Sequence, residues 1–336
     1  MQSGGVKRRE FITLLGGAAA WPLAARAQQP AKIPQIGFLL TGWPQSPDTL
    51  TPIDAFRQGL RQLGYVENQN IAIEYRFAEG KIEHFSNLAV ELVRLNVDLI
   101  VAGNTPAAIA ARQATVTIPI VGAVMGDPIE DGLVASLAQP GGNLTGLTFL
   151  APELTAKRLQ LLKDMLPNVS RVAVLWQPGA FAERTTSDMV KATEAVARTL
   201  GVQLRLIEVR DVGQFGGAFA TMASERVEAL LVFPGSTLFN GRRRLVELAV
   251  AQRLPSIYAA REFVELGGLV SYGANINDLF RRCAVYVDKV LKGAKPAALP
   301  VEQATRFELV INLKAAKELG IDVPLPLMIR ADEMIE

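Results

Sequence analysis

Histidine and cysteine, which often act as general bases, nucleophiles or metal ligands, are scarce in this sequence. His84 and Cys283 are the only examples, so a Ser-His-Asp triad, a zinc site or a histidine proton shuttle is hard to build. The sequence contains neither a P-loop nor a G-x-G-x-x-G motif after a strand-like run. Asp127 or Glu262 could act with another acid, but no feature selects a partner. We therefore predict a protein that is not an enzyme, with no catalytic residue, no metal and no cofactor.

Polar and aromatic residues gather instead in six segments that directly follow apolar, strand-like runs. In an open parallel sheet, ligands bind beyond the carboxyl ends of the strands. We therefore expect these segments to line a cleft between two sheets. They are TGWPQ (41–45), GNTPA (103–107), MGDP (125–128), QPGAF (177–181), FPGST (233–237) and YAAREF (258–263).

Eleven residues in or near these segments are candidate ligand contacts. They are Trp43, Asn104, Thr105, Asp127, Gln177, Phe181, Gly235, Tyr258, Arg261, Glu262 and Tyr272. Asn104 and Thr105 can present side chains and helix-start amides to a carboxylate, or serve simply as helix caps. Asp127 can accept an ammonium group, or begin a turn before Pro128.

The aromatic and charged candidates also have two interpretations each. Trp43, Phe181 and Tyr258 can enclose a flat, apolar ligand, or pack in the core. Arg261 and Glu262 can bind the opposite charges of a zwitterion, or face solvent at a helix start. Tyr272 is expected at the rim of the cleft or at a hinge.

The elements that would position these residues alternate between strands and helices, which predicts βαβ units and parallel sheets. The expected strands are 33–40, 71–75, 97–102, 118–124, 171–175, 202–209, 227–233 and 255–258. The expected helices lie near 53–63, 82–95, 106–113, 186–200, 212–226 and 242–253. We expect helix 186–200 to be capped by Thr185, Thr186 or Ser187 and to end at Gly201. The basic run Arg242–Arg244 is expected to be a solvated helix face.

The two halves of the chain also resemble one another. VDLIVAGN at 97 matches VEALLVFPG at 227, Gly64 matches Gly201, and IPIV at 118 matches LPSI at 254. These ordered matches predict two similar, doubly wound α/β lobes. The segments near 278–292 and 307–319 have no counterpart in the first repeat and are expected to cross between lobes. Lobe 1 would then comprise 33–150 and about 275–306, and lobe 2 would comprise 151–274 and about 307–336.

The N-terminus has the layout of an export signal. Lys7, Arg8 and Arg9 precede an apolar run, and Ala25-Arg26-Ala27 offers a cleavage site. The paired arginines resemble the twin-arginine signal, with an ordinary Sec signal as the alternative. Cleavage near Ala27 would remove four basic residues and one acidic residue, so the formal net charge would fall from +2 to −1. We therefore expect a periplasmic protein with no nucleic-acid partner and no membrane-spanning segment.

Three long blocks carry a family resemblance. They are TPAAIAARQATVTIPIVGAVMGDPIEDGLVASLAQPGGNLTGLTF, LPSIYAAREFVELGGLVSYGANINDLFRRCAVYVDKVLKG and LPVEQATRFELVINLKAAKELGIDVP. They resemble the ABC-transporter substrate-binding family that includes tryptophan- and tyrosine-type binding proteins. The resemblance spans essentially the whole chain after the signal.

This resemblance implies a type I periplasmic binding-protein fold with two lobes and a three-strand hinge. It further implies a monomer that closes on a small-molecule ligand and delivers it to a separate ABC permease and ATPase. A ligand-sensing receptor component would use the same fold and is an alternative function. An enzyme exported by the twin-arginine route is a second alternative.

Overall fold

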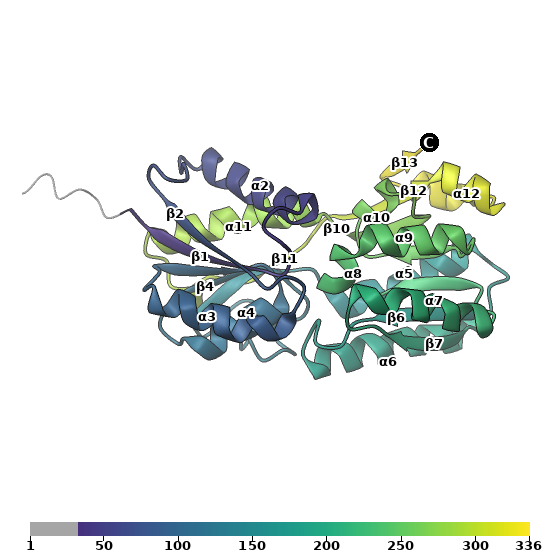
Figure 1. Cartoon of the computed structure of the whole chain (residues 1–336), viewed down its shortest axis with the longest axis horizontal. Helices are drawn as coiled ribbons and strands as arrows, with labels where there is room; N and C mark the ends of the chain where they lie inside the picture. Colours follow the sequence, from purple (N-terminus) through teal and green to yellow (C-terminus); the bar gives the residue numbers. More distant parts are fainter. Residues whose placement is uncertain (1–32) are drawn as a thin grey trace, which may run out of the picture. The chain divides into compact units, whose positions relative to one another are not determined.

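The structure is a computed structural model that describes residues 33–336, apart from the side chain of Asp48. The expected signal at 1–27 lies outside the described residues. Residues 34–336 form one compact unit, in which two α/β lobes are each built on one sheet (Figure 1). These lobes confirm the predicted fold class.

Lobe 1 contains a parallel sheet of six strands in the order β11-β5-β4-β3-β1-β2. Figure 1 shows α2 and α11 over one face of this sheet and α3 and α4 over the other. The strands are β1 (Gln35–Leu40), β2 (Ala72–Phe77), β3 (Leu99–Ala102), β4 (Ile120–Met125), β5 (Leu144–Thr148) and β11 (Glu302–Gln303). The helices are α2 (Pro47–Gln62), η1 (Ile82–His84), α3 (Phe85–Arg94), α4 (Thr105–Ala114), α11 (Ile276–Leu291) and η3 (Pro296–Ala298).

Lobe 2 contains a sheet of seven strands in the order β13-β12-β10-β9-β8-β6-β7, in which β12 runs antiparallel to β10. The strands are β6 (Arg171–Trp176), β7 (Gln203–Glu208), β8 (Ala229–Val232), β9 (Ser256–Tyr258), β10 (Val270–Ala274), β12 (Phe307–Asn312) and β13 (Glu333–Ile335). The helices are α5 (Ala151–Met165), α6 (Glu183–Leu200), η2 (Val212–Gln214), α7 (Phe215–Ser224), α8 (Ser236–Asn240), α9 (Arg242–Ala251), α10 (Glu262–Glu265), α12 (Leu313–Leu319) and α13 (Leu325–Arg330).

The sheet topology is duplicated between the lobes. The order β2-β1-β3-β4-β5 in lobe 1 is repeated as β7-β6-β8-β9-β10 in lobe 2. This repetition confirms the similarity of the halves that the sequence matches predicted. It also brings the carboxyl ends of equivalent strands to equivalent positions in each lobe, where ligands bind in such sheets.

The chain passes between the lobes three times. Phe149 and Leu150 connect β5 to α5, Asn275 connects β10 to α11, and residues 304–306 connect β11 to β12. The Ala304 amide donates a hydrogen bond of 2.8 Å to the Thr148 carbonyl, so the first and third connections lie side by side. One buried apolar cluster includes residues of both lobes, and the interior is therefore continuous through the junction.

Two local predictions are wrong. Helix α6 begins at Glu183 with Ala182 as its N-cap, and no side chain from Thr185, Thr186 or Ser187 caps it. Its end at Gly201, which has a φ of 66°, is as predicted. The basic run is solvated only in part: Arg243 and Arg244 are exposed as predicted, whereas Arg242 is only 6% exposed, with its guanidinium 4.3 Å from the centre of the Phe239 ring.

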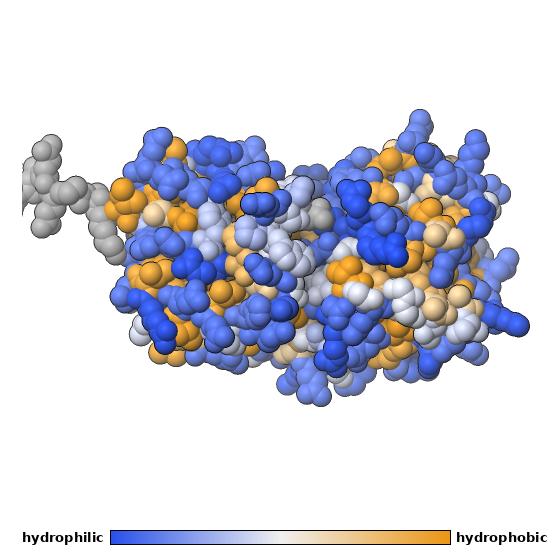
Figure 2. Space-filling view, in the orientation of Figure 1, coloured by the Kyte–Doolittle hydropathy of each residue, from blue (hydrophilic) through white to orange (hydrophobic). Residues whose placement is uncertain are grey.

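Hydrophilic residues dominate the face of the protein shown in Figure 2, with apolar residues scattered among them. Over residues 33–336, no helix combines the length and apolar character that crossing a bilayer requires.

Candidate ligand-binding site

A cavity of about 160 Å³, called the inner cavity below, lies where the two lobes meet. Five of the six segments expected to line a cleft contribute to it. In lobe 1 they are the segments after β1 and β3, and in lobe 2 they are the segments after β6, β8 and β9. The segment 125–128 does not line it. The inner cavity therefore sits at the carboxyl ends of strands from both sheets.

The wall of the inner cavity is mainly apolar and aromatic. Six phenylalanines line it: Phe149, Phe181, Phe233, Phe239, Phe263 and Phe280. Among the described residues, no aspartate, glutamate, lysine or arginine lines it. Such a wall favours the burial of an apolar or aromatic ligand body, since transfer of that surface from water is favourable.

Lobe 1 contributes a polar edge at the start of α4. The Asn104 side chain caps this helix, because its Oδ1 accepts a 3.0 Å hydrogen bond from the Ala107 amide. Its Nδ2 donates to the Thr41 hydroxyl. Thr105 Oγ1 accepts a 3.0 Å bond from the Gly126 amide. The capping interpretation of Asn104 therefore holds, and α4 also directs its N-terminus toward the inner cavity.

Lobe 2 contributes unpaired polar atoms. Ser236 Oγ and Asn240 Nδ2, both on α8, are buried and have no hydrogen-bond partner among the described residues. Gln177 lies behind them, and its Oε1 accepts a 2.9 Å bond from the Thr237 amide at the start of α8. A buried polar group without a partner is costly, so Ser236 and Asn240 are suited to a ligand that supplies hydrogen bonds.

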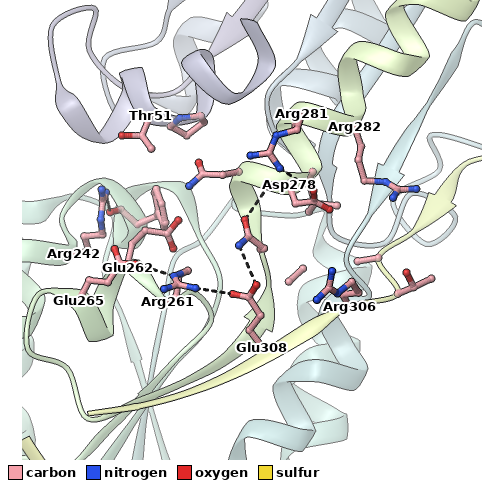
Figure 3. A pocket seen from close by; sticks show the side chains of 18 of the residues that line it. Thr51, Arg242, Arg261, Glu262, Glu265, Asp278, Arg281, Arg282, Arg306 and Glu308 are labelled. Carbon is pink, nitrogen blue, oxygen red and sulfur yellow. Dashed lines mark hydrogen bonds and ion pairs between the residues drawn. The ribbon is translucent and has the colours of Figure 1, made fainter. Parts of the chain in front are cut away.

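A larger, charged cavity of about 570 Å³, called the outer cavity, adjoins the inner one (Figure 3). Both cavities include Pro52, Phe239 and Ala274 in their walls. Ten charged residues line the outer cavity: Arg242, Arg261, Glu262, Glu265, Asp278, Arg281, Arg282, Glu302, Arg306 and Glu308.

Arg261 is the centre of an ion-pair network within this outer wall. Its guanidinium lies 2.8 Å from Glu265, 3.3 Å from Glu308 and 2.6 Å from Glu333. Figure 3 shows Arg261 directed at Glu265 and Glu308. The hydrogen bonds that Arg261 donates, led by the one to Glu265, raise its pKa. Because three carboxylates already surround it, Arg261 is poorly suited to bind a ligand anion.

Glu262 differs from the other acids of the outer cavity. Its Oε2 is buried and has no hydrogen-bond partner in the described part of the chain. Burial raises the pKa of Glu262, and the neighbouring Glu265 adds to this, against the opposing charges of Arg242 and Arg261. A cationic group entering the outer cavity would compensate this carboxylate.

The remaining candidates lie away from the inner cavity. Trp43 is 42% exposed, with its indole against Gly80. Asp127 Oδ1 accepts bonds from the amides of residues 129 and 130, as expected of a residue that begins a turn. Tyr258 is fully buried, and its ring stacks on Phe263 with centres 4.6 Å apart. Tyr258 therefore packs in the core instead of enclosing a ligand.

Tyr272 lies on β10 beside the junction. Its ring centre is 6.2 Å from that of Phe307, and its carbonyl accepts a 2.6 Å bond from Arg158 Nε. Arg158 is fully buried, and burial lowers its pKa to about 9. Of the eleven candidates, the structure brings Asn104, Thr105, Phe181 and Gly235 to the inner cavity and Arg261 and Glu262 to the outer one. Ligand contact by any of them stays a prediction.

Several lining residues were not predicted. Ser236 lies within a candidate segment, but nothing in the sequence distinguished it from its neighbours. Asn240 belongs to the five-residue helix α8, which is too short to give a periodic pattern. Phe149 follows β5, a strand that was not predicted. Over residues 33–336, no group of three or more histidine, cysteine, aspartate or glutamate side chains is placed to hold a metal ion.

Known ligand-binding proteins resemble this chain in sequence. The family model of ABC transporter substrate binding proteins matches residues 45–335. A tyrosine-binding protein of Clostridioides difficile is 26% identical over 267 residues, which are 79% of this chain and 75% of the relative.

Two solved structures are similar over nearly their whole length. One, described as an ABC domain of Streptococcus pneumonia in complex with L-Trp, is 30% identical with a TM-score of 0.81, covering 90% of this chain and 99% of its own. The other, a conserved domain protein of Vibrio cholerae, is 29% identical with a TM-score of 0.82, covering 90% of this chain and 100% of its own.

Proposed function

Because the chain belongs to the ABC transporter substrate-binding protein family, as its resemblance predicted, we propose that it binds an amino-acid-like ligand with an aromatic body. The ligand lies in the inner cavity and touches both lobes. The lobes close around it by hinge motion, and a separate permease and ATPase then receive it. The protein acts as a monomer in the periplasm after removal of its signal near Ala27.

One observation carries this proposal above all. The inner cavity combines an aromatic wall from both lobes with the buried, unpaired Ser236 Oγ and Asn240 Nδ2. An aromatic ligand body fits the wall, while a polar head group forms hydrogen bonds with the two unpaired atoms. The starts of α4 and α11 also lie at the inner cavity, and helix N-termini favour a carboxylate. The relatives described as binding L-Trp and tyrosine support this ligand class.

Native mass spectrometry of the freshly purified protein tests the proposal directly. We expect a co-purified small molecule, or binding of L-tryptophan, L-tyrosine or L-phenylalanine in calorimetry. A ligand at 100 times its dissociation constant adds about 2.7 kcal/mol to the free energy of unfolding. Ser236→Ala combined with Asn240→Ala should weaken this binding. Absence of a bound molecule, together with no binding by any aromatic amino acid, would contradict the proposal.

We further propose that Glu262 receives the ammonium group of the ligand. Glu262 lines the outer cavity, which adjoins the inner cavity at Phe239, and its Oε2 has no hydrogen-bond partner among the described residues. Glu262→Gln should weaken binding of an amino acid by roughly 2 kcal/mol, since a buried cation loses its charged partner. The deaminated acid of the same side chain should bind the two proteins equally. Glu265→Gln is the matched control, because Glu265 is exposed and already paired with Arg261.

A further inference from the structure

The lobes also touch beside the inner cavity. The loop after β4, residues 126–132, lies in lobe 1 against the start of α6 in lobe 2. Asp131 Oδ1 accepts a 3.2 Å hydrogen bond from the Ala182 amide, and Glu130 forms an ion pair with Arg184. Gly126 lies against the Phe181 ring. We call this set of contacts the α6 junction.

We propose that Asp131 is a positioning residue whose protonated carboxyl favours the closed arrangement of the two lobes around the ligand by capping α6 from the opposite lobe. This inference rests on the proposed function, since it assumes that the lobes part to admit a ligand. When they part, the cap is lost and the Asp131 carboxyl enters water.

The capping of α6 explains why this contact suits such a role. Helix α6 spans 18 residues, and no side chain of its own start caps it. A carboxyl oxygen at a helix N-terminus accepts a hydrogen bond from a backbone N–H that has no partner within the helix. Because Asp131 comes from lobe 1, α6 has this cap only while the lobes are in contact.

The α6 junction is joined to the ligand cavity by adjacent residues. Phe181 lines the inner cavity and directly precedes Ala182. The Ala182 amide donates the hydrogen bond that Asp131 accepts. On the other side, the Gly126 amide is bonded to Thr105, which also lines the inner cavity. A ligand that draws the two walls together therefore favours the same lobe arrangement as Asp131.

The surroundings of Asp131 make this contact sensitive to pH. The pKa of its carboxyl is raised to about 6, mainly by burial and in addition by Asp127 on the same loop. The Thr185 hydroxyl and the Ala182 amide, both from lobe 2, oppose this rise. The other charged groups at the contact are Glu130 and Arg184, which pair with each other, and the exposed Glu183 at the start of α6.

Proton linkage gives the direction in which pH shifts the equilibrium between closed and open lobes. With the lobes together the pKa is about 6, whereas the exposed carboxyl returns to its ordinary value of 3.8. The closed arrangement binds the proton more tightly, so closing becomes more favourable as pH falls through 6. Between pH 7 and pH 5 these two values predict that the ratio of closed to open protein rises about tenfold.

Distances between spin labels on the two lobes, measured without ligand, test this inference. Val116→Cys in lobe 1 and Val250→Cys in lobe 2 replace exposed residues, while the native Cys283 is fully buried and escapes labelling. From pH 7 to pH 5 we expect the tenfold rise in the ratio of closed to open populations. Asp131→Asn keeps the acceptor oxygen but cannot ionise, so it should show at pH 7 and at pH 5 the same ratio of closed to open protein, and this ratio should be higher than the unchanged protein reaches at pH 5.

Glu183→Gln serves as the control and should keep the pH response. Contributions from other titrating groups, Glu262 among them, are common to all three proteins and cancel in the comparison. An equal pH response in the Asp131→Asn protein would overturn the inference, as would a single, pH-independent distance in the unchanged protein. Because no ligand is added, these outcomes are independent of whether an aromatic amino acid binds.

Discussion

At Gly126, the backbone of lobe 1 contacts the Phe181 side chain of lobe 2. A Cβ atom built there would lie 2.4 Å from the Phe181 ring. The backbone cannot easily yield, because Thr105 accepts a bond from its amide and Thr148 donates a 2.9 Å bond to its carbonyl. The absence of a side chain at position 126 therefore lets Phe181 reach the wall of the inner cavity.

We expect Gly126→Ala to lower the free energy of unfolding by about 1–3 kcal/mol, the usual cost of overpacking. Phe181→Ala removes the ring that the new methyl group meets. The double variant should thus lose less stability than the sum of the two single variants. Urea denaturation of all four proteins measures this coupling, and strictly additive losses would show that the two residues do not meet.

At this scale, the sequence predicts which residues follow strands but not where their side chains point. Asn104 and Phe181 reach the inner cavity, whereas Tyr258 also ends a strand and turns into the core beside Phe263. Gln177 turns toward the backbone of α8. Rotamer choice in these segments depends on packing partners far away in the chain, which a local pattern does not contain.

Helix ends are the best predicted feature at the scale of elements. Gly201 ends helix 186–200 as predicted, and Gly64, Gly293 and Gly320 follow helices in the same way; all four have positive φ values in the structure. A residue with a Cβ atom is strained in this conformation, so the requirement for glycine is local and visible in the sequence. The start of α6 was not predicted correctly, because its cap comes from Asp131, 51 positions earlier in the chain.

Substitutions at two glycines with open surroundings should change the stability through the backbone conformation alone, without a change in packing. No atom would lie within 4 Å of a Cβ at Gly201, where φ is 66°, or at Gly217 within α7. Gly201→Ala should lower the free energy of unfolding by about 1 kcal/mol, because alanine is strained at this φ. Gly217→Ala should raise it by roughly 0.5–1 kcal/mol, because alanine favours the helix. Urea denaturation checks both, and a shift of the same sign in both variants would refute the backbone explanation.

Strand prediction succeeded where strands are apolar and central. The eight expected strands all exist, with ends shifted by one or two residues. Most of the unpredicted strands, namely β5, β10, β11 and β12, adjoin the connections between the lobes, whereas β13 lies at the outer edge of the lobe 2 sheet. In β5, Gly146 has a φ of 140° and approaches the backbone of Gly122, and this glycine weakens the strand pattern. The two residues of β11 are too few to form a pattern.

For the whole molecule, the internal repeat was the decisive sequence signal. The matched blocks predicted two similar lobes, and each lobe contains the same five-strand order. The repeat predicts that the lobes share one topology, and it predicts the sheet edge at which a ligand is expected to bind. It does not fix the charge inside the cleft, because the outer cavity is lined partly by α11 and by the last connection, which lie outside the repeat.

The continuity of the interior predicts how the whole protein unfolds. Cys283 of lobe 1 and Leu309 of lobe 2 belong to the same buried cluster, with partly buried Trp176 of lobe 2 packed against it. Three connections also join the lobes, so we expect one cooperative transition in urea.

In the chain that starts at Gln28, Trp43→Phe leaves Trp176 as the only tryptophan, and its fluorescence reports on lobe 2. Cys283 is fully buried, and burial raises the pKa of its thiol, so its labelling reports the unfolding of lobe 1. The two midpoints should coincide, whereas labelling of Cys283 at a lower urea concentration would show that lobe 1 unfolds separately.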